Sequence, residues 1–310
     1  MSSAAESAKM DENNTGLLAT QTRPFYWSVR RELWEYRSIW IAPLAAAGLV
    51  LFGFALRALK LPHMLNSAAK LSPMAKHAAM AAPFAFAAGA IIVTGLIVSI
   101  FYCLGALNNE RRDRSILFWK SLPVSDSTTV LSKAFVPFVV LPAVVLVIAI
   151  LTQLVMLLLG SAVLLANRID PGTLWTQIPL LQISAVMVYF VVINTLWYAP
   201  IFGWLLMVSS WARRMAFLWA TLPWLGLALV EKIALDSHYV WSFLTYRSKG
   251  TLIEGFTFPP GPHKPTEVIE PLSLLAPAHF FSAPGLWLGL LVAAIFIAAA
   301  VWYRRMRDPG

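Results

Sequence analysis

The sequence predicts an all-α polytopic membrane protein: six transmembrane helices preceded by an amphipathic interfacial helix, with both termini in the cytoplasm. Three observations support this fold class. Of the 310 residues, 59% are hydrophobic and only 13% are charged, whereas a soluble domain has about 25% charged residues. The apolar runs are about 18–30 residues long, enough to cross a bilayer as helices. They also lack the polar–apolar alternation that marks the strands of a membrane barrel.

The first 38 residues predict a tail followed by a helix. Residues 1–23 are polar and contain no apolar stretch typical of a signal peptide, so we expect a flexible cytoplasmic tail. Between residues 24 and 38, Phe25, Val29 and Leu33 recur at helical spacing among charged residues. This pattern favours an amphipathic helix lying in the cytoplasmic membrane interface. An ordinary cytosolic helix is the alternative.

A six-span transmembrane domain is predicted over residues 39–305, followed by a short cytoplasmic tail at 306–310. The predicted spans are residues 39–56, 79–107, 133–166, 176–209, 215–235 and 285–303. Proline lacks a backbone donor and disturbs helices, so kinks or breaks are expected at several positions. The prolines concerned are Pro137, Pro142, Pro179, Pro200 and Pro223.

The distribution of basic residues predicts the orientation. Fifteen of the 24 Lys and Arg residues lie in the N-terminal segment, in the loops after the second and fourth spans, and after the sixth span. The other nine are spread over longer connections on the opposite side. Basic residues are enriched in short cytoplasmic loops, so both termini are predicted to be cytoplasmic.

The longest predicted outer loop covers residues 236–284. Its two apolar patches, at 239–244 and 273–281, predict short helices that pack on the outer ends of the spans. A connection of this length without any element of its own would be unusual in a compact domain.

The loop at 108–133 is the only densely charged segment between two long apolar runs. Five consecutive charged residues begin at Glu110. Each would cost about 2.5–3.5 kcal/mol at the bilayer centre, so the loop lies outside the membrane. Residues 115–122 read as a short amphipathic helix that ends at Pro123, and Ser125 or Asp126 is the expected N-cap of the next helix. A short apolar helix held between two spans predicts a docking element on the cytoplasmic side.

The sequence lacks the motifs that mark several classes of protein function. The sequence contains no GxxxxGK[ST], GxSxG, HExxH or CxxC stretch, so it predicts no phosphate loop, catalytic residue or cofactor site in this chain. The net charge is +9, but the basic residues that produce it lie close to span ends, which argues against nucleic-acid binding. Cys103 is the single cysteine, and no metal site is predicted, because no pair of histidines has a helical ligand spacing. The histidines all fall on the predicted outer side: His63, His77, His238, His263 and His279.

Four polar residues lie within predicted spans: Gln153, Gln182, Tyr189 and Asn194. Polar groups at membrane depth often mark a substrate path, so these four are its candidates. The alternative is structural, because amides and hydroxyls also bond neighbouring helices to one another.

The central loop and the predicted topology together resemble the ABC-2 type permeases, the membrane subunits of ATP-binding-cassette exporters. Glu110, Leu122, Pro123 and Lys133 match that family's acidic start, Leu-Pro turn and basic residue entering the third span. The family commonly has a small residue after the charged group, and residues 113–115 (Asp-Arg-Ser) depart from that pattern. The architectural likeness covers residues 24–305.

The resemblance implies an export permease in the bacterial inner membrane. It further implies a dimer with a second permease copy or a paralogue, surrounded by membrane lipids, with ATP and Mg bound by a separate ATP-binding subunit. That subunit would dock on the segment 110–125, the family's coupling helix. The residues implied to couple to it are Glu110, Arg111, Arg112, Asp113, Arg114, Ile116, Leu117, Phe118, Trp119, Leu122 and Pro123.

Two alternatives come from other classes of protein. One is a membrane-embedded enzyme acting on lipid-like substrates, which would need convergent acid–base groups on facing spans. The other is a membrane scaffold or sensor subunit that uses the same cytoplasmic segment to hold a partner without transport.

Overall fold

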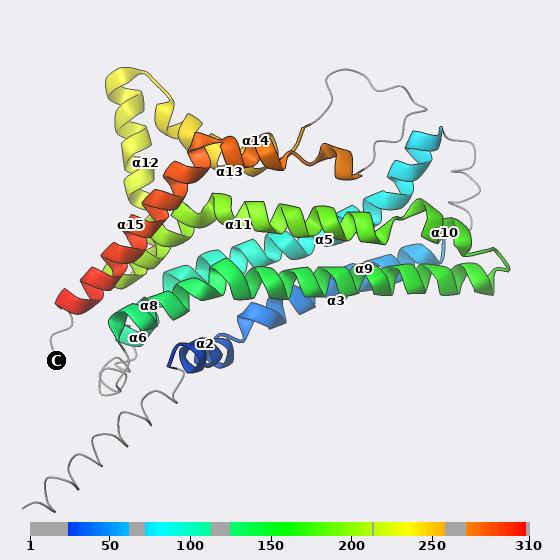
Figure 1. Cartoon of the computed structure of the whole chain (residues 1–310), viewed down its shortest axis with the longest axis horizontal. Helices are drawn as coiled ribbons and strands as arrows, with labels where there is room; N and C mark the ends of the chain where they lie inside the picture. Colours follow the sequence, from blue (N-terminus) through cyan, green and yellow to red (C-terminus); the bar gives the residue numbers. More distant parts are fainter. Residues whose placement is uncertain (1–23, 62–71, 113–124, 213, 258–270, 308–310) are drawn as a thin grey trace, which may run out of the picture.

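The computed structural model of the chain is built almost entirely from helices (Figure 1). It describes residues 24–61, 72–112, 125–212, 214–257 and 271–307. Within these ranges no strand is formed, and the only β-type pairing is an isolated bridge between Phe256 and Leu275. The predicted all-α class is therefore confirmed.

Six helical runs in the described ranges are long and apolar enough to cross a membrane, as the sequence predicts. The third run starts at Asp126 rather than at the predicted residue 133, because α8 continues through a π-helical turn (Val136–Val140) into α9. The helices that form the runs are α3 (Ser38–Ala58), α5 (Pro73–Gly105), α8 (Asp126–Phe135) with α9 (Leu141–Ala166), α11 (Leu180–Trp211), α12 (Ala216–Leu235) and α15 (Pro284–Arg307).

Shorter helices occupy the two ends of the bundle. Near one end are α2 (Pro24–Glu35) and α6 (Asn108–Arg112). The predicted outer loop contains α13 (Tyr239–Gly255), a 3-10 turn (Pro271–Leu274) and α14 (Pro277–Ser282), so its two apolar patches do form helices. A further short helix, α10 (Gly172–Gln177), precedes α11.

Capping and proline positions explain several helix boundaries. Ser125 caps α8, because its Oγ accepts a hydrogen bond from the Thr128 backbone N–H at 3.1 Å. Pro137 lies in the π-helical turn, where a missing donor is tolerated. Pro179 separates α10 from α11, whereas α11 and α12 continue through Pro200 and Pro223.

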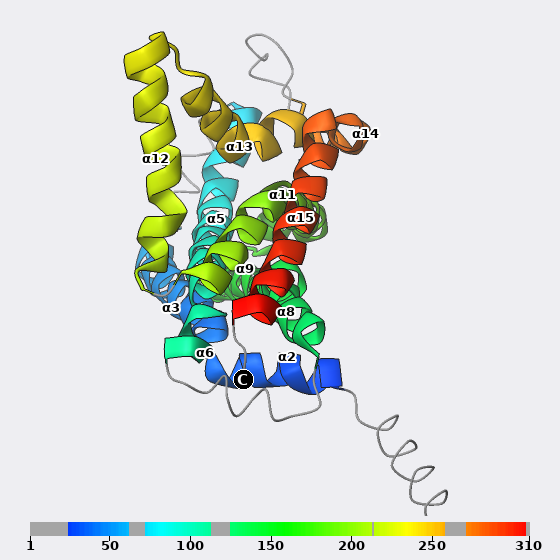
Figure 2. The same cartoon turned by 90° about the vertical axis from the view of Figure 1, so that its left-hand side faces the viewer.

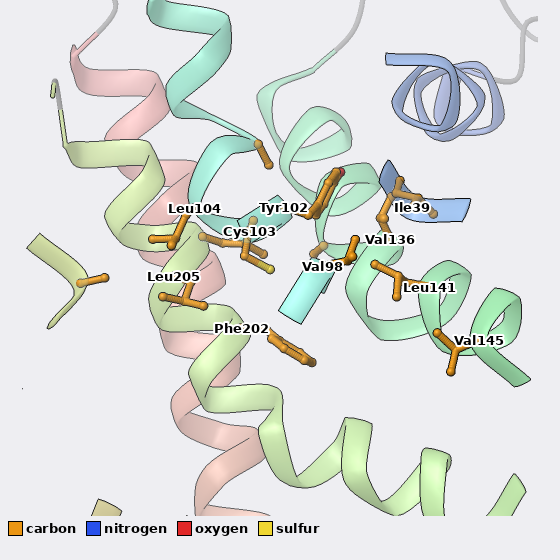
Figure 3. Packing of buried hydrophobic residues seen from close by; sticks show 14 of the residues in the cluster. Ile39, Val98, Tyr102, Cys103, Leu104, Val136, Leu141, Val145, Phe202 and Leu205 are labelled. Atoms are coloured by element: carbon orange, nitrogen blue, oxygen red, sulfur yellow. The ribbon is translucent and has the colours of Figure 1, made fainter. Parts of the chain in front are cut away.

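The central apolar core lies where α3, α5, α9 and α11 pack against one another (Figure 3). The cluster includes Val98 and Cys103 of α5, Leu141 and Val145 at the start of α9, and Phe202 of α11. Lipid tails are as apolar as these side chains, so within a bilayer the four helices associate through close van der Waals packing rather than through removal of apolar surface from water.

Helices α11 and α15 pack closely along much of their length. A methyl group placed on Gly203 would lie 3.0 Å from the carbonyl oxygen of Ala293. Glycine therefore allows the two backbones to approach, a packing mode common between membrane helices.

The two ends of the bundle differ in what covers them. Helix α2 lies across one end, close to α6 and α8 (Figure 2). Helices α13 and α14 lie at the other end, and α12 stands apart from α11 and α15 in the same view. We call these the α2 end and the α13 end. The sequence predicts that the α2 end is cytoplasmic, which stays a prediction.

Candidate functional site

The α2 end contains four ionised side chains that are almost completely buried. They are Glu32 of α2, Glu110 of α6, Lys133 of α8 and Arg304 of α15, with exposed fractions between 0% and 3%. Arg31 and Asp126 lie at the edge of this group. We call the six residues the charge cluster: Arg31, Glu32, Glu110, Asp126, Lys133 and Arg304.

Lys133 lies at the centre of the charge cluster. Its Nζ donates to Glu32 Oε1 at 2.8 Å and lies 3.1 Å from Glu110 Oε1. The second oxygen of Glu32 accepts a hydrogen bond from the Tyr102 hydroxyl of α5 at 2.9 Å. One lysine therefore connects α8 to α2 and α6, and Glu32 extends the connection to the second span.

Glu110 receives two further cations. Arg31 Nη2 donates to Glu110 Oε1 at 2.7 Å, and Arg304 Nη1 donates to Glu110 Oε2 at 2.9 Å. Arg304 also donates through Nε to Asp126 Oδ1 at 3.0 Å. The guanidinium of Arg304 thus joins the end of α15 to the residues on both sides of the central loop.

The turn between α5 and α6 aims Glu110 into the cluster. Ser209 of α11 accepts hydrogen bonds from the backbone N–H groups of Leu107 and Asn108, both at 3.0 Å. Asn109 donates from Nδ2 to the Tyr36 hydroxyl at 3.3 Å. The two contacts with Ser209 satisfy backbone donors that a buried helix start would otherwise leave unpaired.

The charge cluster is electrically balanced, with three carboxylates facing three cations. Burial of a single unpaired charge is costly, whereas a paired and hydrogen-bonded set is tolerated, and removing one member of a pair costs about 3–5 kcal/mol. Glu35 lies outside this balance, 3.8 Å from Arg31. Burial and the nearby Glu32 raise the pKa of the Glu35 carboxyl above its ordinary value, despite the neighbouring cations.

Most of the residues implied to couple to a partner lie outside the described part of the chain. This holds for Asp113, Arg114, Ile116, Leu117, Phe118, Trp119, Leu122 and Pro123, and for the expected short helix at 115–122. Arg111 and Arg112 belong to α6. The Glu110 side chain points inward and is 2% exposed, so its contacts are with this chain's own residues rather than with a partner.

The four polar residues within spans do not gather at one site. Gln153 donates from Nε2 to the Phe84 carbonyl oxygen of α5 at 3.3 Å. Tyr189 donates to the Gly255 carbonyl oxygen at 3.0 Å, and Asn194 Oδ1 accepts from Thr251 at 3.3 Å. Gln182 is partly exposed on α11. Three of the four connect helices, which favours the structural interpretation over a shared substrate path.

Sequence reasoning missed the charge cluster, although a signal for it was present. The sequence pattern marks Arg304 only as one of the basic residues that indicate orientation, and Lys133 also as the basic residue that enters the third span. Glu32 and Glu110 fall at the same predicted end of the bundle, and the opposite signs could have suggested pairing. In the described ranges, no group of three His, Cys, Asp or Glu side chains is placed to hold a metal ion.

Comparisons with known proteins add no family to these observations. No protein-family model, curated protein or solved structure matches the chain. The six apolar helices and the charge cluster are therefore the observations on which a functional proposal must rest.

Proposed function

We propose that this chain is the transmembrane permease subunit of an ATP-binding-cassette exporter of the bacterial inner membrane. In this proposal a separate ATP-binding subunit docks on the segment 110–125 and hydrolyses ATP with Mg, while this chain carries the substrate path. The observation that supports it best is the charge cluster, because it holds both flanks of the central loop. Glu110 lies near the start of the loop at 108–133, and Asp126 and Lys133 lie near its end.

The charge cluster would transmit movement of the loop to the spans. Glu32 and Arg31 connect the loop flanks to α2, Tyr102 connects them to α5, and Arg304 connects them to α15. A satisfied network of this kind is rigid, since every member except Asp126 has two or more ion-pair or hydrogen-bond partners. A pull on the loop would therefore move α2, α5, α8 and α15 together as a body.

In this proposal, the loop segment 110–125 makes the contact with the ATP-binding subunit. Glu110 is committed to internal pairs and has a positioning role. Phe118 and Trp119 would supply an apolar anchor, and the flanking charges would orient the partner during association. A second permease copy or a paralogue would complete the transporter, with this chain itself binding no nucleotide.

The orientation can be tested with single cysteines. Cys103 is the single cysteine of the chain, so a Cys103→Ala background contains no thiol before a new cysteine is introduced. Trp34→Cys at the α2 end and Tyr239→Cys at the α13 end replace side chains that are 72% and 79% exposed. In intact cells, a membrane-impermeant maleimide should label residue 239 and not residue 34. The reverse pattern would contradict a cytoplasmic docking loop.

The function can be tested by isolating the chain from its native membrane. We expect a subunit with a phosphate-loop motif to copurify and to hydrolyse ATP at a rate that depends on this chain. Phe118→Ala and Trp119→Asp should leave membrane insertion intact and uncouple hydrolysis from transport. Tyr239→Ala, an exposed aromatic at the opposite end, is the matched control and should leave coupling unchanged.

Two results would contradict the proposal. One is a purified chain with no associated ATPase. The other is a complex in which ATP turnover and transport are the same in the wild type and in both loop variants. A partner that binds the loop without hydrolysing ATP would instead favour the scaffold alternative.

A further inference from the structure

An apolar groove runs between α12 and the neighbouring helices α5, α11 and α15, and α13 closes it at one end. Its volume is about 390 Å³, within the range of about 300–1,000 Å³ typical of small-molecule sites. Phe217 of α12 and Leu288 of α15 line opposite walls and are 56% and 64% exposed. The groove is therefore open along its side, between two helices that are candidates to span the membrane.

Arg247 of α13 is the only charged residue that lines this groove, and it is 8% exposed. Its Nη2 donates to the Gly285 carbonyl oxygen at 3.0 Å, and its Nη1 donates to the Trp197 carbonyl oxygen at 3.4 Å. The guanidinium also lies 4.8 Å from the centre of the Trp197 ring, a favourable cation–π contact. These contacts orient the cation without neutralising it.

Two glycines make room for this arrangement. A methyl group on Gly289 of α15 would lie 2.1 Å from Arg247 Nη2, and one on Gly250 of α13 would lie 2.1 Å from the Trp197 ring. Any larger residue at either position would displace the arginine or its aromatic partner. The position of Arg247 is thus built by residues from three helices.

The carboxylates of the adjoining elements are already engaged elsewhere. Glu254 binds the Tyr246 hydroxyl and lies 3.4 Å from His279. Glu231 accepts hydrogen bonds from Ser237 and from the backbone of α13, and Asp236 pairs with Lys232. Among the described residues, no carboxylate is paired with Arg247. Burial lowers the pKa of Arg247, yet an arginine stays protonated at neutral pH.

We propose that the groove binds a membrane phospholipid with an anionic head group, with the phosphate at Arg247 and an acyl chain along the apolar walls. Arg247 has no carboxylate partner among the described residues, so a bound anion would stabilise it, and its two carbonyl contacts occupy only two of the five guanidinium donors. The apolar walls and the lateral opening match a chain that enters from the bilayer. The site does not depend on the proposed transport function, because it lies in this chain alone.

The test measures lipid binding by the purified full-length chain in detergent, without an ATP-binding subunit. Tritiated dioleoylphosphatidylglycerol and dioleoylphosphatidylcholine share their acyl chains and differ in head-group charge. We expect saturable binding of phosphatidylglycerol that is about tenfold tighter than that of phosphatidylcholine, the size of a charge-assisted contact. Arg247→Gln should abolish this preference, and Arg247→Lys should retain part of it.

Two control pairs keep the test independent of folding. Lys249→Gln removes an exposed cation from the same helix and should leave the preference intact. Val292→Trp fills the groove and should weaken binding of both lipids, whereas Leu291→Trp, at an exposed position outside the groove lining, should not. Equal binding of the two lipids by the wild type would overturn the proposal. So would a preference that survives Arg247→Gln, or binding of both lipids that is unchanged in Val292→Trp.

Discussion

At the α2 end, three carboxylates and three cations neutralise one another and four of the six are almost completely buried, whereas at the α13 end Arg247 is buried with carbonyl oxygens and an indole ring as its contacts. The α2 end joins four helices through ion pairs between side chains far apart in the sequence. The α13 end relies on aromatic packing around Trp197, Tyr246 and Phe280.

The comparison suggests different roles for the two ends. A balanced cluster is suited to transmit force, because its ion pairs join four helices through buried side chains. A cation in an apolar groove, with no carboxylate paired to it among the described residues, is suited to bind an anion from outside the chain. Four substitutions test this contrast, from the largest expected effect to the smallest.

Replacing Lys133 should have the largest effect. Lys133→Met leaves Glu32 and Glu110 buried without their central cation, and we expect a loss of about 4 kcal/mol in the free energy of unfolding. The measurement is SDS titration of the chain in mixed micelles. Lys249→Met, an exposed lysine at the α13 end, is the control. The double variant Glu32→Gln/Lys133→Met should be less destabilised than the two single effects added together, and strict additivity would mean that the pair is not coupled.

Replacing Arg304 should separate α15 from the loop flanks. Arg304→Gln removes the cation shared by Glu110 and Asp126, and we expect a loss of about 3 kcal/mol. Hydrogen exchange should also increase at the end of α15 and in the first turn of α8. The neighbouring Arg305 is exposed, so Arg305→Gln should leave both measurements unchanged. Similar behaviour of the two variants would argue against the cluster.

Gly250 tests the α13 end through packing rather than charge. Gly250→Ala brings a methyl group against the Trp197 ring, and overpacking of this kind costs about 1–3 kcal/mol. Gly226→Ala is the matched control, because no atom lies within 4 Å of the added methyl group. That control should gain up to about 1 kcal/mol from helix propensity. If both variants were stabilised, the result would contradict the close contact between Gly250 of α13 and Trp197 of α11.

Glu35 should give the smallest effect, with a characteristic pH dependence. The pKa of Glu35 is raised in the folded chain, so the folded state loses stability as the pH rises from the ordinary value of 4.5 through the raised value. Glu35→Gln removes this penalty and should raise the melting temperature slightly at pH 7. The difference should disappear as the pH falls towards 4. A variant less stable than the wild type at pH 7 would mean that the ion pair with Arg31 outweighs the penalty.

The sequence was sufficient for the fold class because its main signal is local. Apolar runs of span length predict helices without knowledge of their neighbours, and all six appear. Ser125 was also predictable as an N-cap, since capping depends on a few adjacent residues. The third helical run begins earlier than predicted because residues 126–132, most of which are polar, extend the helix as α8.

The charge cluster could not be derived in the same way. Its six members come from four helices, α2, α6, α8 and α15, and nothing in the local pattern states that Glu32 and Lys133 meet. Helical periodicity placed Glu32 on a polar face of an interfacial helix, whereas the structure buries it completely. Arg247 was counted as one of the outer basic residues, and only the packing of Gly289 and Trp197 shows that it is buried.

The position of Arg304 in the last of the six runs has a consequence for biogenesis. During translation, Glu110 and Asp126 emerge long before the guanidinium that they share, so the α2 end cannot close until the final apolar helix has been inserted. A chain stopped ahead of that residue would leave Asp126 without its ion pair to Arg304 and Glu110 with only Arg31 and Lys133, a defect that membrane quality-control proteases could recognise. Completion of synthesis and acquisition of the mature architecture are thereby linked through one side chain.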